Sequence, residues 1–229
     1  MNDVVEKSVL WWKENKYTKI IRQKHIPVLT NLFGIKWKYK ESIYGNYFKQ
    51  KNSKIFLKAI NNFCKLKNFR LGDESNLFEP GSNCGRNLKI LFDRYNSNCY
   101  AFDISQEAID ILEQKVFAGI DNKVFTSVGN ILKSNYLDKF EDNYFDLVFT
   151  HGFLMHLPII PEKKKLIESL KRIAQHIIIF ELYDKNKTGT YTFYNNNEYC
   201  LSYDNYESYG LKYQPDADYE KKQLRIYYR

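Results

Sequence analysis

The feature of this chain that most constrains its fold is a glycine-bearing turn that follows a short apolar segment and precedes an acidic residue. Residues 77–88 read LFEPGSNCGRNL, so Gly81 and Gly85 follow apolar residues, and an amphipathic pattern begins after them. Eighteen residues after Gly85, the apolar stretch Cys99-Tyr100-Ala101-Phe102 ends at Asp103. A tight turn after one strand, with an acidic residue at the tip of the next, is typical of a site for a nucleoside cofactor.

From residue 76 onward, apolar strand patterns alternate with helical patterns, which indicates a parallel sheet with helical crossovers. Ser105 is a suitable N-terminal cap for one helix, and Pro161 followed by Glu162 marks the start of another. We expect strands near 76–80, 98–103, 123–127, 144–150, 176–182 and 223–228, and helices near 85–95, 105–118 and 162–174. The segment after residue 183 is irregular and rich in Tyr and Asn.

The part of the chain before this pattern is expected to be helical. Apolar residues at near-helical spacing predict a helix over 51–65, and residues 1–25 suit one or two amphipathic helices. We therefore divide the chain into an N-terminal helical extension, residues 1–70, and a domain, residues 71–229, that carries the glycine turn and is expected to bind the cofactor. The extension is expected to pack on the core, and it is a candidate wall of a substrate pocket.

The spacing of the two glycines restricts the class of cofactor. Gly81 and Gly85 form G-x-x-x-G, whereas dinucleotide-binding proteins use G-x-G-x-x-G. Arg86-Asn87 stands where a phosphate-binding P-loop needs Lys followed by Ser or Thr. The turn therefore favours a cofactor without phosphates and argues against a nicotinamide-dependent reductase.

Composition adds expectations about compartment and partners. No stretch approaches the roughly 20 apolar residues that a membrane span needs, and the N-terminus does not resemble a signal peptide. The cysteines Cys64, Cys84, Cys99 and Cys200 show no C-x-x-C spacing, so we expect reduced, mostly buried thiols and no metal site. We therefore expect a cytoplasmic protein. The formal charge is +8, which could suit nucleic acid. Because Lys, Asn and Tyr are abundant throughout the chain, we attribute this charge to a general compositional bias and not to a localised patch.

Four segments of the chain, in order, resemble the motifs of class I S-adenosylmethionine-dependent methyltransferases. Residues 79–85 resemble the first motif, E/D-x-G-x-x-x-G, and Phe102-Asp103-Ile104-Ser105 resembles the second. Ser127-Val128-Gly129-Asn130-Ile131 stands where the family usually has Gly-Asp, and residues 145–150 resemble the fourth motif, F-D-x-V. The resemblance covers about residues 76–182. It implies a Rossmann-like α/β fold, with helices on both faces of a mostly parallel seven-stranded sheet, beside the N-terminal helical extension.

A narrower resemblance points to one branch of that family. Residues 81–88 and the loop at 150–156 are similar to small-molecule methylases associated with bacterial pseudaminic-acid and surface-glycan gene sets. The resemblance implies S-adenosyl-L-methionine as cofactor and transfer of its methyl group to an oxygen or nitrogen atom of a small polar metabolite, such as a sugar or surface-glycan precursor.

The resemblance also implies the residues of the cofactor site. The acidic residue of the second motif, here Asp103, accepts hydrogen bonds from both ribose hydroxyls, which suits a carboxylate at a strand tip. Gly81 lets the backbone approach the methionine portion, and Gly85 permits close contact between strand and helix. Asn130 replaces the usual acid beside the adenine. The cofactor-binding candidates are Glu79, Gly81, Asn83, Gly85, Asn87, Asp103, Ile104, Asn130, Ile131, Thr150 and His151.

Three side chains are candidates for the acceptor chemistry. His151 and His156 flank the loop after the fourth strand, and a histidine can take an acceptor proton near neutral pH. Their five-residue spacing would not place them on one helix face, which argues against a metal pair. Glu181, at the end of the fifth strand, is the third catalytic candidate. Tyr183, Tyr191 and Tyr194 are weaker candidates for the lining of an acceptor pocket.

Two other functions stay open at this point. One is a methyltransferase that acts on RNA or protein, because interleaved aromatic and basic residues suit single-stranded RNA. The other is a non-catalytic protein that keeps the cofactor pocket without turnover. Nucleic acid is the less favoured partner, no membrane partner is expected, and the oligomeric state is left open.

Overall fold

The computed structural model describes residues 52–120, 122–184, 186–194, 199–214 and 224–229. Its centre is a seven-stranded sheet in the order β3-β2-β1-β4-β5-β9-β8. The strands are β1 (Asn76–Pro80), β2 (Asn98–Asp103), β3 (Val124–Val128), β4 (Phe145–His151), β5 (Ala174–Leu182), β8 (Lys212–Gln214) and β9 (Leu224–Tyr228). Strands β1 to β5 pair in parallel, whereas β9 pairs antiparallel with both β5 and β8. The predicted Rossmann-like fold with a mostly parallel seven-stranded sheet is therefore confirmed.

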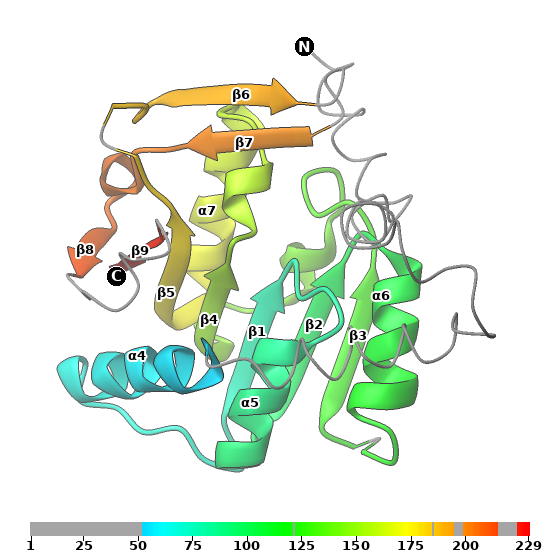
Figure 1. Cartoon of the computed structure of the whole chain (residues 1–229). Coiled ribbons are helices and arrows are strands. Elements are labelled where there is room, and N and C mark those ends of the chain that lie inside the picture. Colours follow the sequence, from blue (N-terminus) through cyan, green and yellow to red (C-terminus); the bar gives the residue numbers. More distant parts are fainter. Residues whose placement is uncertain (1–51, 121, 185, 195–198, 215–223) are drawn as a thin grey trace, which may run out of the picture.

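Helices cover both faces of this sheet (Figure 1). The helices are α4 (Asn52–Leu66), α5 (Arg86–Tyr95), α6 (Gln106–Ile111) and α7 (Pro161–Ile173). Short turns of helix are η1 (Leu112–Val116), η2 (Tyr136–Lys139), η3 (Leu154–His156) and η4 (Tyr206–Tyr209). The helix expected at 105–118 is interrupted, because α6 passes into the π-helical turn η1 at Leu112. Ser105 caps α6 as predicted, since its Oγ accepts a hydrogen bond from the backbone N–H of Ala108 at 3.2 Å.

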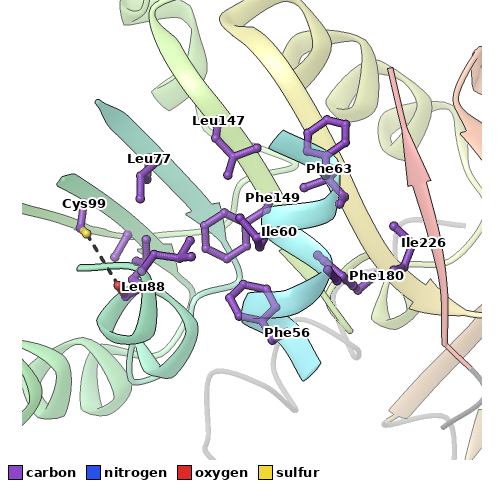
Figure 2. Close-up of a cluster of buried hydrophobic side chains, with 14 of the residues drawn as sticks. Phe56, Ile60, Phe63, Leu77, Leu88, Cys99, Leu147, Phe149, Phe180 and Ile226 are labelled. Carbon is purple, nitrogen blue, oxygen red and sulfur yellow. Dashed lines mark hydrogen bonds between the residues drawn. The ribbon is translucent and has the colours of Figure 1, made fainter. Parts of the chain in front are cut away.

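The alternation of side chains along the strands divides the core into two layers. Leu77 belongs to one buried cluster and its neighbour Phe78 to the other, because successive strand residues point to opposite faces. Figure 2 shows the first cluster, in which Phe56 and Phe63 of α4 pack toward the sheet. The helix predicted at 51–65 is thus part of the main core. The patterns expected within residues 1–50 lie outside the described residues.

An additional two-stranded sheet was not anticipated. Strands β6 (Thr190–Tyr194) and β7 (Tyr199–Tyr203) pair antiparallel within the segment that the sequence left irregular. In Figure 1 this hairpin lies beyond the carboxyl ends of β4 and β5. Ligands of open α/β sheets bind at the carboxyl ends of the strands. The hairpin therefore lies on the side of the sheet where the candidate site is expected.

Candidate functional site

The glycine turn lies between the carboxyl ends of β1 and β2. The backbone N–H groups of Gly81 and Ser82 both donate to the carbonyl of Phe102, at 2.7 and 3.2 Å. Gly81, Asn83 and Gly85 have positive φ angles of 69°, 51° and 76°. Glycine and asparagine adopt this left-handed region most readily, so the residue types of the turn match its backbone. The sequence run therefore folds into a tight turn that is anchored to the second strand.

The space beside each glycine is filled by the chain itself. A Cβ atom built on Gly81 would overlap the ring of Phe153, which comes from the loop after β4. A Cβ on Gly85 would lie 2.7 Å from Cδ1 of Leu112. At Gly85, the missing side chain makes room for Leu112 of η1. At Gly81, the missing side chain makes room for Phe153, a residue that the sequence did not single out.

Asp103 shapes the turn from the tip of β2. Its Oδ2 accepts from the backbone N–H of Asn83 at 2.7 Å, and its Oδ1 accepts from that of Ser105 at 2.9 Å. Burial raises the pKa of Asp103, and backbone hydrogen bonds from Ser105, Asn83 and Ile104 oppose the increase. A carboxylate has about four lone-pair positions. Asp103 therefore keeps acceptor capacity beyond its backbone partners, and its side chain is only partly buried.

Glu79 and Asn87 form a buried pair behind the turn. Asn87 Nδ2 donates to Glu79 Oε1 at 2.7 Å, and Arg86 Nε donates to the other end of the Asn87 amide at 3.3 Å. Glu79 is 2% exposed, and its Oε2 has no hydrogen-bond partner among the described residues. Burial therefore raises the pKa of Glu79 to about 8. An unpartnered buried oxygen costs free energy, so this atom is suited to a ligand that can donate to it.

The segment after β3 contains Asn130, the residue expected beside the adenine. Asn130 Oδ1 accepts from the backbone N–H of Leu132 at 3.0 Å, which fixes a local turn. Ile131 is buried and Ile104 partly buried. A separate hollow of about 480 Å³ lies next to this segment. Its lining residues, none of which is a predicted cofactor-binding residue, are Phe102, Ser127, Val128, Ser134, Asn135, Tyr136 and Lys139.

The two histidines have different surroundings. The ring of His151 lies against Phe56 and Phe180, with ring centroids 5.9 and 5.6 Å apart, on the α4 side of the sheet. His156 ends η3, and its Nδ1 is 3.3 Å from the carbonyl oxygen of Cys200 in β7. Burial lowers the pKa of His156 to about 4. The imidazole of His156 is therefore neutral near pH 7 and a weak base.

Thr150 and Glu181 contact each other at the ends of β4 and β5. Both side chains are buried, and Thr150 Oγ1 donates to Glu181 Oε1 at 2.6 Å. Of the other polar candidates, Tyr183 lies under Arg225, whose guanidinium carbon is 3.2 Å from the centre of the ring. Tyr191 is 45% exposed, and the side chain of Tyr194 lies outside the described residues.

A buried ion pair that the sequence did not predict joins α7 to the segment after the hairpin. Lys163 Nζ lies 3.0 Å from Asp204 Oδ2 and donates to Ser202 Oγ at 2.9 Å. Tyr209 Oη donates to the same oxygen of Asp204 at 2.9 Å. Burial lowers the pKa of Lys163, while Asp204 opposes that decrease. Lys163 follows the helix start at Pro161 by two residues, and nothing in the local pattern distinguishes it from Lys164 and Lys165.

Comparisons with known proteins agree with this architecture. Residues 78–176 match the model of a family described as "Methyltransferase domain". No curated protein sequence matches the chain at a significant level.

Several solved structures share the fold. Geranyl diphosphate C-methyltransferase from Streptomyces coelicolor A3(2) is 11% identical, with a TM-score of 0.53, over 79% of this chain and 85% of that one. A methyltransferase from Methanosarcina mazei is 14% identical, with a TM-score of 0.53, over 72% of this chain and 96% of that one. A candidate methyltransferase from Methanococcus maripaludis is 19% identical with a lower TM-score of 0.49. The match covers 63% of this chain and 62% of that protein.

Proposed function

We propose that the chain is a class I S-adenosylmethionine-dependent methyltransferase, which its match to a methyltransferase family over residues 78–176 supports. We propose further that it transfers the methyl group to an oxygen or nitrogen atom of a small polar metabolite. A sugar or a surface-glycan precursor is the acceptor class that we favour. The observation that carries the proposal is the placement of the unpartnered carboxyl oxygen of Glu79, the glycine turn and Asp103 at the ends of two adjacent parallel strands.

The residues of the turn fit this cofactor. Asp103 has acceptor capacity to spare at the tip of β2, which suits two ribose hydroxyls. Glu79 Oε2 is a buried acceptor in need of a donor, and we assign it to the cofactor's ammonium group. Asn87 acts behind Glu79, because its amide is already bonded to that carboxyl group. Asn130, Ile104 and Ile131 would then surround the adenine at the end of β3.

The chemistry of the step needs little from the protein apart from position. The bound cofactor would supply a methyl group on a sulfonium. The acceptor's lone pair would bond to the methyl carbon as the carbon–sulfur bond breaks in line, and the thioether S-adenosylhomocysteine would leave. Positioning of the two reactants can supply a large part of the rate. An alcohol or ammonium acceptor must also lose a proton. Among the candidates we favour His151 as the proton acceptor, because burial makes His156 a weak base and Glu181 is already occupied by hydrogen bonds.

The acceptor side is assigned to the elements around the ends of β4 and β5. The hairpin β6–β7 lies beyond these ends, and α4 packs beside His151. We propose that the hairpin and the N-terminal extension, residues 1–70, shape the acceptor pocket on the catalytic domain, residues 71–229.

We also propose that the protein is cytoplasmic. The four cysteines are free and buried. No helix in the described part of the chain is long and apolar enough to cross a membrane.

Calorimetric titration with S-adenosylhomocysteine tests the cofactor assignment. We expect binding by the wild-type chain and strongly reduced binding by Asp103→Ala, because the ribose hydroxyls lose their charged acceptor. Glu107→Ala, in the first turn of α6, is the matched control and should bind normally. Absence of binding by the wild-type chain would refute the cofactor assignment.

Transfer from methyl-labelled cofactor tests the acceptor class. Label should enter a small molecule when the chain is incubated with a metabolite extract. Label in RNA or protein would favour the alternative acceptor class. Cofactor binding with no labelled product from extract, RNA or protein would favour a non-catalytic cofactor-binding protein.

A further inference from the structure

Among the carboxylates in the described part of the chain, that of Glu181 accepts the most hydrogen bonds. It is 0% exposed and accepts four hydrogen bonds, all from the segment at the end of β4 and just after it. Its Oε1 accepts from Thr150 Oγ1 at 2.6 Å and from the backbone N–H groups of Phe153 and Leu154 at 3.2 and 3.1 Å. Its Oε2 accepts from the backbone N–H of Met155 at 3.0 Å.

This arrangement does not suit a general base. A base must reach the proton that it removes, and a fully buried carboxylate that already holds four donors has no open approach. The same arrangement suits a residue that fixes the position of the neighbouring loop. Three consecutive backbone N–H groups converge on one carboxyl group, and hydrogen bonds to a charged acceptor are the stronger kind. The turn from Phe153 to Met155 is therefore held to the end of β5.

The loop at residues 153–155 contacts the glycine turn through Phe153, and this contact depends on the position of the loop. The ring of Phe153 occupies the space that a side chain at Gly81 would fill. Gly81 is itself fixed, because its N–H donates to the carbonyl of Phe102 at 2.7 Å. A shift of the loop would therefore move the ring of Phe153 along the surface of the turn, while the turn stays in place.

On the far side, the same loop is tied to the hairpin. Ser202 Oγ in β7 donates to the carbonyl of Leu154 at 3.4 Å, and Lys163 Nζ donates to the carbonyl of Leu157 at 3.3 Å. The loop thus connects the glycine turn with the elements that we assign to the acceptor. The carboxylate of Glu181 accepts hydrogen bonds from the middle of this loop, residues 153–155.

We propose that Glu181 is a positioning residue of the cofactor site, which acts by holding the ring of Phe153 against Gly81 so that the ring forms a wall of the pocket for the cofactor's methionine end. This inference rests on the proposed function. It assigns to Glu181 a role through other residues, without contact to the reacting atoms, and it adds Phe153 to the cofactor pocket.

A double-mutant cycle with S-adenosylhomocysteine as the titrant tests this inference. Glu181→Gln turns one acceptor into a donor that faces an N–H or hydroxyl group, and it should weaken binding at least about 10-fold. Phe153→Leu should weaken binding as well, because the wall is lost. In the Phe153→Leu background, Glu181→Gln should change the affinity less than about 3-fold, because the path through the ring is already broken.

The control is Glu168→Gln, an exposed carboxylate of α7 that pairs with Lys171 on the surface and should leave affinity unchanged. Titrations are made at a temperature at which circular dichroism shows every variant folded. If Glu181→Gln does not fold, Thr150→Val removes one donor and leaves the carboxylate, and it takes the place of Glu181→Gln in the cycle.

The outcomes separate this inference from the proposed function. Failure of the wild-type chain to bind would refute the cofactor assignment itself. Normal binding by wild type with unchanged affinity in Glu181→Gln would overturn only the positioning role. Equal losses from Glu181→Gln in the wild-type and Phe153→Leu backgrounds would also overturn it, because a general structural role predicts additive effects.

Discussion

Among single residues, the two carboxyl groups beside the glycine turn, Asp103 and Glu79, differ in their hydrogen-bond partners. Asp103 has a backbone N–H on each oxygen, and these bonds favour its charged form against the effect of burial. Glu79 has one partner, Asn87, and an unpartnered second oxygen. Burial therefore dominates at Glu79 and raises its pKa to about 8. The carboxyl group costs least when it is protonated or when a cation binds to it.

Glu79→Gln should raise the free energy of unfolding relative to wild type, by an amount that increases with pH. In the native state Glu79 keeps its proton up to about pH 8, whereas the unfolded chain releases it near pH 4.5. The stability of the wild-type chain should therefore fall as pH rises from about 4.5 to 8, because the native state binds more protons there. Glu79→Gln stays neutral, so its advantage over wild type should be larger at pH 9 than at pH 5. Each unit of pKa shift corresponds to about 1.36 kcal/mol.

Urea unfolding of the cofactor-free protein at pH 5 and pH 9 measures that difference. Glu168→Gln, on the exposed surface of α7, is the control and should show no comparable change with pH. A difference between Glu79→Gln and wild type that is the same at both pH values would contradict the raised pKa.

Among the elements, the attachment of the hairpin region to α7 depends on charge. Lys163 comes from the first turn of α7, and Asp204 follows β7. Both are buried, and they are 3.0 Å apart. Buried ion pairs add little net stability, but removal of one partner leaves an uncompensated buried charge. The pair therefore makes the position of the segment after β7 specific with respect to the core.

Removal of the lysine alone should be costly. Lys163→Met is expected to lower the free energy of unfolding by about 3–5 kcal/mol, because Asp204 keeps only Tyr209 and its local backbone as partners. The double variant Lys163→Met with Asp204→Leu should recover much of this loss. Lys164→Met, at the exposed next position, should be nearly neutral. Denaturant unfolding of the four proteins measures these values, and a double variant less stable than Lys163→Met would argue against an ion pair.

Considered as a whole, the molecule places its candidate site at the carboxyl edge of the parallel strands. The turn after β1, the tip of β2 and the loops after β3 and β4 all lie at that edge, because parallel strands end on the same side. A ligand bound there contacts several elements at once. Its binding should therefore stabilise the folded chain against complete unfolding.

Thermal unfolding with added nucleoside ligands measures this linkage. S-adenosylhomocysteine at about 100 times its Kd should add about 2.7 kcal/mol. For a chain of 229 residues that corresponds to a rise in Tm of roughly 5–10 °C. NAD at the same concentration should leave the Tm unchanged, because the glycine spacing does not suit a pyrophosphate. An equal rise with NAD would contradict the exclusion of dinucleotides.

Local patterns were enough to predict strands β1 to β5, strand β9 and most of the helices, whereas β6, β7 and β8 were not predicted. Residues 76–80 and 98–103 were predicted as the strands that the structure contains, because a buried parallel strand requires a run of apolar residues. The turn between them was recognisable because positive φ angles require glycine or asparagine at particular positions. The hairpin β6–β7 was missed, because Tyr is abundant throughout the segment after residue 183 and composition does not set the Tyr-rich strands apart there.

The sequence by itself determined the order of the elements, the glycine turn and the acidic residue at the tip of β2, since each depends on residues close together in the chain. Only the tertiary structure decided how the polar groups are used. Glu181 accepts from Thr150, 31 residues away, and Phe153 fills the space beside Gly81. Glutamate at a strand end can be a base or a support, and its partners and burial distinguish the two. Those partners come from separate strands and loops, so no local pattern records them.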